Sequence, residues 1–387
     1  MASFLSHAIP GRTNILLKIR NYFLEEKKVY IIVLNYNNFD DTIECVNSLL
    51  KLSYANRNIV ICDNGSTDGS FLRLVQWSAD ICCEDNYLRY HVLDKEMALN
   101  SILSLQSERC NLILINNKSN LGYSAGNNIG LKLSMSMGDL SYAWILNNDT
   151  VVQKEALTHL VEKMDRNPTI GLCGSTLLYR HNPKRVQALG GFTYIPSLGV
   201  SRQIGNGMLW DPEKISPLAE INVEAKMFGV QGASLFVRKD FLDIVGFLSE
   251  DYFLYCEEED WAMKSRGKFF LGYSSASVVF HKEGQSTGSN SFSSAKSFVS
   301  EYFLARNRLL FTKKFFPYYL PTAFLGNGLI AIKRILKGQL RNSLLIILCS
   351  FDFLMEIVYG GSEECRSSLN KKNSFFLKPF CRVLFRR

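Results

Sequence analysis

Short polar runs recur along the first 150 residues, and each one directly follows a run of apolar residues. The runs are Asn35-Tyr36-Asn37, Asp63 to Asp68, Asn116 to Gly122, and Asn147-Asn148-Asp149. Each run alone also fits a simple turn, because Asn, Asp, Gly and Ser are the commonest turn residues. Four such runs in series, each at the end of a predicted strand, instead indicate one binding site rich in hydrogen-bonding groups.

A second chemical feature is an acidic run in which Glu257, Glu258, Glu259 and Asp260 are consecutive. A carboxylate at the start of a helix gains only about 0.3 to 1 kcal/mol from the helix dipole, which explains one or two acidic residues better than four. A carboxylate can also remove a proton from a hydroxyl group within hydrogen-bond reach. The acidic run is therefore the candidate source of a general base.

The elements that must position these residues follow from the apolar runs. Strands are predicted at Val29 to Leu34, Asn58 to Cys62, Asn111 to Ile115 and Tyr142 to Leu146. A helix capped by Asp40 or Asp41 joins the first two strands, which gives a β-α-β unit and hence a parallel sheet. We expect a doubly wound α/β domain whose ligand lies at the carboxyl ends of the strands, where the polar runs are.

The second half of the chain is less regular. Residues His181 to Glu224 are punctuated by Gly and Pro and are expected to form an irregular insert. Order is predicted to return in a strand at Gly232 to Val237, helices at Lys239 to Val245 and Glu257 to Arg266, and a strand at Ser277 to His281.

Composition indicates a folded protein of 387 residues with 47% hydrophobic and 21% charged side chains. The ten cysteines form no C-x-x-C pair, which favours reduced thiols and a cytoplasmic protein. No signal peptide is expected, because Pro10, Arg12 and Lys18 interrupt the N-terminal apolar residues. The expected organisation is an N-terminal extension over 1–27, a catalytic domain over 28–295 and a helical region over 296–387.

The net charge of +8 comes from the C-terminal region, where residues 296–387 carry 16 Lys and Arg against 5 Asp and Glu. Two apolar stretches there, Leu320 to Ile332 and Leu344 to Val358, are too interrupted to span a membrane. They are expected to form helices that lie on an anionic membrane or pack on the catalytic domain. We favour the membrane, at the inner face of the plasma membrane. The chain has no nucleic-acid motif, so nucleic acid is not an expected partner.

Three classes of nucleotide-binding protein are disfavoured because their signature motifs are missing. A nicotinamide-dependent oxidoreductase would show G-x-G-x-x-G after the first strand, whereas Leu34 leads into Asn-Tyr-Asn-Asn. No G-K-[ST] follows the spaced glycines at 122, 126 and 130, which excludes a P-loop. A sugar nucleotidyltransferase would need a basic, Gly-rich first loop, and that is also absent.

The four polar loops, the acidic run Glu257 to Asp260 and His281 follow one another along the chain. In this order they resemble the family 2 glycosyltransferases with the GT-A fold, most closely the bacterial rhamnosyltransferase-like branch. The similarity covers Val29 to about Arg308. It implies transfer of a sugar, with rhamnose favoured, from a dTDP- or UDP-linked donor to a saccharide or polyprenyl-linked saccharide in cell-surface polysaccharide synthesis.

The resemblance also implies roles for particular residues. The donor-binding positions are Asn35, Asp63, Asn64, Ser66, Asn120, Gly122, Asn127 and Asn148. Asp149 takes the place of the last carboxylate of the family's D-x-D motif, which holds Mg²⁺ or Mn²⁺ against the diphosphate, and His281 resembles the histidine that completes this metal site in part of the family. Asn147 replaces the first aspartate, so weak metal affinity is expected without donor.

Glu258 takes the family's general-base position, and the resemblance implies a single displacement with inversion. An ordinary Glu has a pKa of about 4.3, so we expect Glu258 to be ionised at neutral pH. The departure at Asn147 leaves one alternative open, a catalytically silent nucleotide-sugar-binding subunit of a polysaccharide assembly complex.

Overall fold

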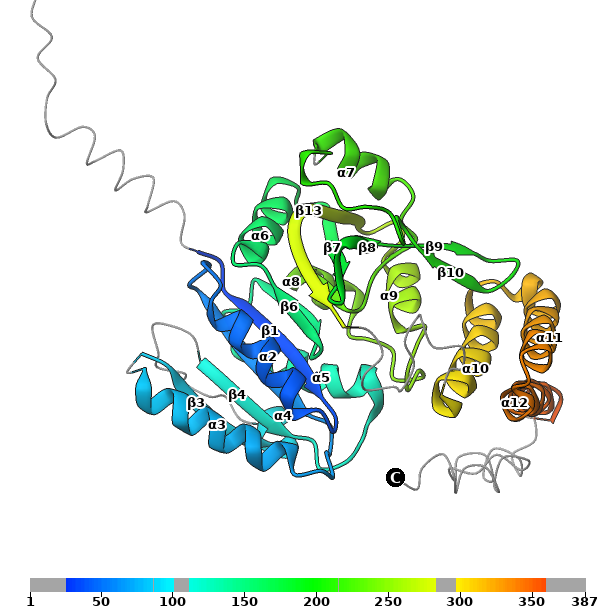
Figure 1. Cartoon of the computed structure of the whole chain (residues 1–387), viewed down its shortest axis with the longest axis horizontal. Helices are drawn as coiled ribbons and strands as arrows, with labels where there is room; N and C mark the ends of the chain where they lie inside the picture. The colour runs from blue at the N-terminus through cyan, green and yellow to red at the C-terminus, as the bar shows by residue number, and fades with distance from the viewer. Residues whose placement is uncertain (1–25, 86, 101–110, 215, 283–296, 360–387) are drawn as a thin grey trace, which may run out of the picture.

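The computed structural model describes residues 26–85, 87–100, 111–214, 216–282 and 297–359 (Figure 1). Most of the predicted N-terminal extension, the end of the predicted catalytic domain and the last 28 residues therefore lie outside the described part of the chain.

A large mixed sheet forms the centre of the molecule, with strand order β3-β4-β2-β1-β5-β12-β7-β13-β6 and β8 paired to β7. The strands of its first half are β1 (Val29–Asn35), β2 (Arg57–Asp63), β3 (Arg89–Asp94), β4 (Asn111–Asn116) and β5 (Tyr142–Asn147), all parallel. The second half contains β6 (Thr150–Val152), β7 (Ile170–Tyr179), β8 (Asn182–Leu189), β12 (Ser234–Arg238) and β13 (Phe270–His281). Strand β12 runs antiparallel between β5 and β7.

Helices cover both faces of this sheet, as expected for a doubly wound domain. Along β1, Val29, Ile31 and Val33 join one buried cluster and Tyr30 and Ile32 join the other, because alternate side chains point to opposite faces. The first cluster is closed by α2 (Phe39–Leu50), α3 (Ser70–Glu84) and α6 (Ala156–Arg166). The second is closed by α4 (Lys95–Asn100), α5 (Gly122–Ser136), α8 (Lys239–Val245) and α9 (Glu257–Ser265).

The predicted α/β fold is confirmed, and the four predicted strands of the first half are present within one residue at each end. One prediction about this half was wrong. The N-cap of α2 is Asn38, and Asp40 and Asp41 lie in the first helical turn. Carboxylates are favourable there too, because they face the positive end of the helix dipole. The prediction also missed β3, whose sequence has only one fully buried residue, Leu93.

The expectation of an irregular insert at 181–224 was also wrong. Strand β8 joins the main sheet, and a hairpin of β9 (Gly191–Ile195) and β10 (Val200–Gln203) forms a small second sheet with β11 (Gly229–Val230). Helix α7 (Pro217–Glu224) follows. The glycines mark the turn between two short strands, since Gly199 has a φ of +61°.

The described part of the C-terminal region, residues 297–359, is helical, as predicted, with α10 (Phe298–Phe315), α11 (Leu320–Leu336) and α12 (Leu340–Tyr359) grouped beside α9 (Figure 1). A small core of its own contains Ala305, Ala331, Ile346 and Cys349. Among the described residues, none of the helices is both long enough and apolar enough to cross a membrane.

The small sheet meets the main sheet at a crossing of glycines. A Cβ atom added to Gly174 would lie 1.9 Å from the carbonyl oxygen of Gly190, and one added to Gly191 would lie 1.9 Å from that of Gly229. These contacts are to backbone, which cannot move aside as a flexible side chain could. The close approach therefore requires glycine.

We predict that Gly174→Ala lowers the free energy of unfolding by at least about 1 to 3 kcal/mol, the usual cost of overpacking. The control is Gly328→Ala in α11, where an added Cβ would meet nothing within 4 Å; it should raise stability by about 0.5 to 1 kcal/mol. Urea unfolding followed by circular dichroism measures both. Equal stability of Gly174→Ala and wild type would contradict the close approach.

Candidate active site

The carboxyl ends of β1 and β2 are joined by side-chain hydrogen bonds. Asn35 donates from Nδ2 to Asp63 Oδ1 over 2.7 Å, and both residues are buried. Ser66 donates to the same carboxylate from its hydroxyl, over 2.6 Å, and from its backbone N–H, over 3.0 Å. Three of the predicted donor-binding residues thus form one connected group at the expected edge of the sheet.

Asn148 is attached to this group from the end of β5. Its amide donates to Thr42 Oγ1 over 2.9 Å, and Thr42 in turn donates to Asn35 Oδ1 over 2.8 Å. Thr42 belongs to α2, so this chain of bonds fixes the start of that helix against the strand ends. Asn148 therefore acts within the protein as a support for Asn35.

The loop after β4 closes the other side of the group. Asn64 donates from Nδ2 to Asn120 Oδ1 over 3.0 Å and to the carbonyl of Gly122 over 3.1 Å. Gly122 has a φ of +83°, and an added Cβ would lie 2.4 Å from the carbonyl oxygen of Phe253, so glycine is required here. Asn127, one turn further along α5, is fully buried, and its Oδ1 has no hydrogen-bond partner in the described part of the chain.

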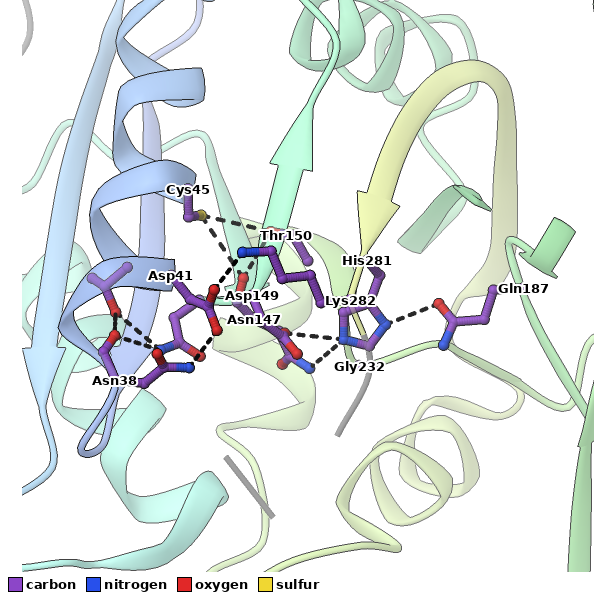
Figure 2. A network of polar contacts seen from close by, with 12 residues as sticks. Asn38, Asp41, Cys45, Asn147, Asp149, Thr150, Gln187, Gly232, His281 and Lys282 are labelled. Atoms are coloured by element: carbon purple, nitrogen blue, oxygen red, sulfur yellow. Dashed lines mark hydrogen bonds and ion pairs between the residues drawn. The ribbon is translucent and has the colours of Figure 1, made fainter. Parts of the chain in front are cut away.

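Asp149 and His281 face each other at the end of β5 and the end of β13 (Figure 2). Asp149 Oδ1 lies 3.1 Å from His281 Nε2, and both side chains are buried. His281 Nδ1 lies 2.9 Å from Gln187 Oε1 on β8. The amide oxygen accepts from Nδ1–H, so Nε2 is the ring nitrogen that faces the carboxylate and the one that would bind a metal ion.

This pair fits a divalent cation, since a carboxylate and a neutral imidazole are both metal ligands and their donor atoms converge. Burial raises the pKa of Asp149, but the charge and hydrogen bond of His281 and the charge of Lys282 outweigh it, so the pKa is lowered. Asp149 is therefore ionised at neutral pH. The described residues contain no cluster of three or more His, Cys, Asp or Glu that could hold a metal ion. Donor oxygens would have to complete the shell.

Glu258 lies at the start of α9, where its carboxylate rests against Gly232. An added Cβ on Gly232 would lie 2.0 Å from Glu258 Oε1. The hydroxyl of Tyr123 donates to the carbonyl of Gly232 over 2.9 Å. Burial raises the pKa of Tyr123, and the charges of Glu258, Glu257 and Asp149 raise it further. The charges of the predicted base and of the predicted metal ligand thus act on the same side chain.

The acidic run is largely withdrawn from water. Burial raises the pKa of Glu258 to about 7 and that of Glu259 to about 8, while burial and the charge of Glu258 hold the pKa of Glu257 well above its usual range. The expectation that Glu258 is ionised at neutral pH without tuning was therefore wrong. A carboxylate with a pKa near the working pH is better suited to take up and release a proton.

Helix α10 holds the loop that precedes α9. Asn307 is fully buried and donates from Nδ2 to the carbonyls of Leu254, over 2.8 Å, and Tyr255, over 3.0 Å. Tyr255 and Cys256 have left-handed φ values of 71° and 74°, which are costly for residues other than glycine. Lys314 reaches Asp260 over 2.6 Å. The C-terminal helices therefore support the loop that presents Glu258.

Four residues of this site were missed from the sequence: Gly232, Tyr123, Gln187 and Lys282. Lys282 follows His281 directly and forms ion pairs with Asp41 (Figure 2) and with Glu44. Its position next to the predicted metal ligand in the sequence could have indicated this role. No sequence signal marks Gly232, Tyr123 or Gln187, because their roles depend on contacts between distant segments.

Residues 30–96 and 98–217 match the family model described as glycosyl transferase family 2. The matched part is just under half of the chain and contains the four polar loops and Asp149. The chain is a glycosyltransferase that is similar to this family.

Several solved structures share a distant likeness in fold. The mannosyltransferase PcManGT from Pyrobaculum calidifontis, solved with GDP-Man and Mn²⁺, is 12% identical with a TM-score of 0.46, over 90% of this chain and 95% of that one. TarS 1–349 from S. aureus, solved with UDP-GlcNAc, is 16% identical with a TM-score of 0.42, over 73% and 66%. GalNAc-T7, solved with UDP, GalNAc and Mn²⁺, is 13% identical with a TM-score of 0.48, over 74% and 51%. No curated protein sequence matches the chain significantly.

We predict that Gly232→Ala reduces turnover strongly without unfolding the protein. The new Cβ would occupy the position of Glu258 Oε1, the end of a flexible side chain that can turn away. Nucleotide affinity, measured by calorimetry, should change little, while kcat should fall by roughly 10² or more, in the range attributed to a general base. Gly328→Ala, at a helical position with open space and no positive φ, is the control for the substitution type. Unchanged kcat in Gly232→Ala would show that Glu258 is not held there for catalysis.

Proposed function

We propose that this glycosyltransferase is an inverting enzyme that moves one sugar from a nucleoside-diphosphate donor to a hydroxyl group of a saccharide or polyprenyl-linked saccharide. The observation that carries the proposal is the meeting of β12 with the end of β5. Gly232 contacts the carboxylate of Glu258, and the adjacent Ala233 accepts a hydrogen bond over 3.2 Å from the backbone N–H of Asn147, two residues before Asp149. The proposed proton acceptor and the proposed metal ligand are thereby held close to one another. Inverting transfer needs both, one for the attacking hydroxyl and one for the leaving diphosphate.

The donor would lie on the polar edge of the sheet. Asp63, with Asn35 and Ser66 bonded to it, supplies a fixed acceptor group for a pyrimidine base, which favours a dTDP- or UDP-linked sugar. The loop of Asn120 and Gly122 would close over the nucleotide, and the unpartnered Asn127 Oδ1 offers a further acceptor. Rhamnose is the favoured sugar, because the motifs resemble the rhamnosyltransferase-like branch.

Mg²⁺ or Mn²⁺ would be held by Asp149 and His281, with Gln187 fixing the tautomer of the histidine. Such an ion offsets the negative charge that develops on the departing diphosphate. Asn147 lies 3.4 Å from His281 Nε2 through its Nδ2 and contributes no charge, so the site depends on one carboxylate.

Glu258 would take the proton of the acceptor hydroxyl as its oxygen forms a bond to the anomeric carbon and the bond from that carbon to the diphosphate breaks. Gly232 and the buried neighbours of Glu258 orient its carboxylate and exclude water. A single displacement of this kind inverts the anomeric configuration.

The alternative is a silent nucleotide-sugar-binding subunit, favoured only by the missing first aspartate at Asn147. The two proposals differ in one measurement. Purified protein with Mn²⁺ and a hydrolysable donor should release nucleoside diphosphate if it is an enzyme, and should only bind the donor if it is silent.

We further propose that α11 and α12 bind the inner face of the plasma membrane, where a polyprenyl-linked acceptor would be found. Each helix exposes an apolar stripe at spacings of three and four residues, which lie along one side of a helix. The stripes are Leu325, Leu329, Ile332 and Leu336 on α11, and Leu340, Leu344, Ile347, Phe351 and Leu354 on α12. Lys333, Lys337 and Arg341 stand among them and complement anionic lipid.

The first prediction from the proposed function concerns the general base, Glu258. Glu258→Gln should lower kcat by roughly 10² to 10⁴ with little change in donor affinity, because glutamine cannot accept the proton. In wild type, kcat/KM should rise with pH through about 7 and then level off, because Glu258 is protonated below that pKa and inactive. This limb should vanish in Glu258→Gln.

Glu257→Gln is the matched control and should be milder. Should Glu257→Gln abolish transfer while Glu258→Gln retains it, the assignment within the acidic run is wrong by one residue. A product that keeps the donor's anomeric configuration by NMR would overturn the mechanism.

The second prediction concerns the metal. Asp149→Ala should weaken nucleoside-diphosphate binding at least about tenfold in the presence of Mn²⁺, because it removes the only charged ligand of the pair. Calorimetry of wild type, Asp149→Ala and the exposed control Asp80→Asn, each with Mn²⁺ and with EDTA, tests this. Equal affinity of wild type under both conditions would contradict metal-assisted binding.

The third prediction concerns the membrane. The full-length protein should float with anionic vesicles at low salt and not with neutral ones, since each Lys or Arg near such a surface contributes about 1 kcal/mol. Serine at Leu329, Ile332, Leu344 and Ile347 together should abolish flotation. Leu72→Ser removes an equally exposed leucine from α3 and should have no effect. If wild type stays with the soluble fraction, the helices are packing elements only.

A further inference from the structure

A polar hollow of about 480 Å³ lies beside the proposed catalytic centre, outside the residues assigned to the donor. It is lined by Phe192, Ser201, Arg202, Gln203, Asn206 and Gln231. Five of these residues come from the hairpin of β9 and β10 and the turn that follows it, and the sixth precedes Gly232. The volume is within the usual range for a site that binds a small molecule.

The hollow is connected on one side to the general base. Gln231 is adjacent in sequence to Gly232, against which the Glu258 carboxylate rests. Ser201 interacts with the carboxylate of Glu259, the next residue of α9, and thereby lowers the pKa of this carboxyl group against the effect of burial. A molecule in the hollow would therefore lie next to the group that is to take its proton.

The other side of the hollow is connected to the metal pair. Asn206 donates from Nδ2 to the backbone carbonyl of Gln187 over 3.0 Å, and the side chain of Gln187 holds His281. Residues that line the hollow are thus linked both to the base and to the metal ligands, which is what the binding site of the second substrate requires.

Two side chains in the lining are available to a ligand. Within the described residues, neither the guanidinium of Arg202 nor the side-chain amide of Gln231 makes a hydrogen bond or an ion pair. Arg202 is exposed and Gln231 is half-buried. Asn206, by contrast, already donates to Tyr179, Gln187 and Gln203.

The charges around the hollow determine which ligand fits. Asp149 is ionised, and Glu258 must be ionised to accept a proton, so an anionic group placed beside them would be repelled. Arg202 is the cationic member of the lining, and its planar fork matches phosphate and carboxylate oxygens in pairs. An acceptor whose reacting hydroxyl lies at Glu258 and whose anionic group lies at Arg202 would match both residues.

We propose that this hollow is the acceptor subsite and that it takes a saccharide carrying a phosphate or carboxylate group next to the sugar that reacts. The assignment rests on the proposed glycosyl transfer. The anion could be the phosphate of a lipid-linked saccharide or the carboxylate of a uronic acid, which have the charge and the oxygen geometry in common.

The test uses glucose 1-phosphate, glucuronic acid and glucose as probes, with their dissociation constants measured by NMR titration. Full-length protein is first saturated with Mg²⁺ and with UDP or dTDP, whichever stabilises it more in a thermal-shift assay, so that the probes cannot occupy the donor site. Arg202→Gln is compared with Arg202→Lys and with Lys268→Gln, which removes one exposed positive charge outside the hollow.

We expect at least one anionic probe to bind more tightly than glucose and Arg202→Gln to weaken that probe roughly tenfold or more, the usual scale for hydrogen bonds to a charged group. Arg202→Lys should be intermediate and Lys268→Gln unchanged. A preference for glucose 1-phosphate supports a lipid-linked phosphate, and a preference for glucuronic acid supports a uronic acid.

Equal binding of all three probes, or equal loss in Lys268→Gln and Arg202→Gln, would overturn the proposal while leaving glycosyl transfer intact. Failure of both UDP and dTDP to stabilise the protein in the first step would instead remove the proposed function, and the acceptor subsite with it.

Discussion

The contact between Glu258 and Gly232 is the constraint on which the arrangement of the site depends. Strand β12 runs antiparallel to β5, so its beginning, rather than its end, lies at the carboxyl edge of the parallel strands. This brings Gly232 beside the last residues of β5, and Asn147 donates to the carbonyl of Ala233 over 3.2 Å. Only a residue without a side chain leaves room there for the carboxylate from α9. One reversed strand therefore joins the donor half of the domain to the catalytic helix.

Holding three glutamates at the start of α9 is unfavourable in itself, because burial and mutual repulsion disfavour their charged forms. The structure offsets this with a second layer of support. Asn307 of α10 fixes two carbonyls of the preceding loop, where Tyr255 and Cys256 adopt left-handed conformations. Strain and buried charge of this kind persist only where surrounding contacts over-determine them, and here those contacts come from the C-terminal region.

Much of the fold could be predicted from the sequence, because β1, β2, β4 and β5 are continuous apolar runs that end in polar residues. The same local pattern located Asn35, Asp63 and Asp149. It could not reveal β8, whose first four residues are exposed, or the role of Gln187, which depends on β8 lying near β13. The pKa of Glu258 was mispredicted for the same reason, since burial by distant segments has no local signature.

The glycine crossing between the two sheets has a consequence for how this enzyme could diversify. Gly174 and Gly191 are fixed by the backbone carbonyls of Gly190 and Gly229, whereas the exposed residues Ser201 and Arg202 of β10 contribute nothing to the two clusters of the main core. Substitutions at these exposed positions can therefore accumulate at little cost to folding. The glycine contact between the sheets then stays constant while the exposed surface of the hairpin changes. New substrate specificities could arise there without a change in the reaction.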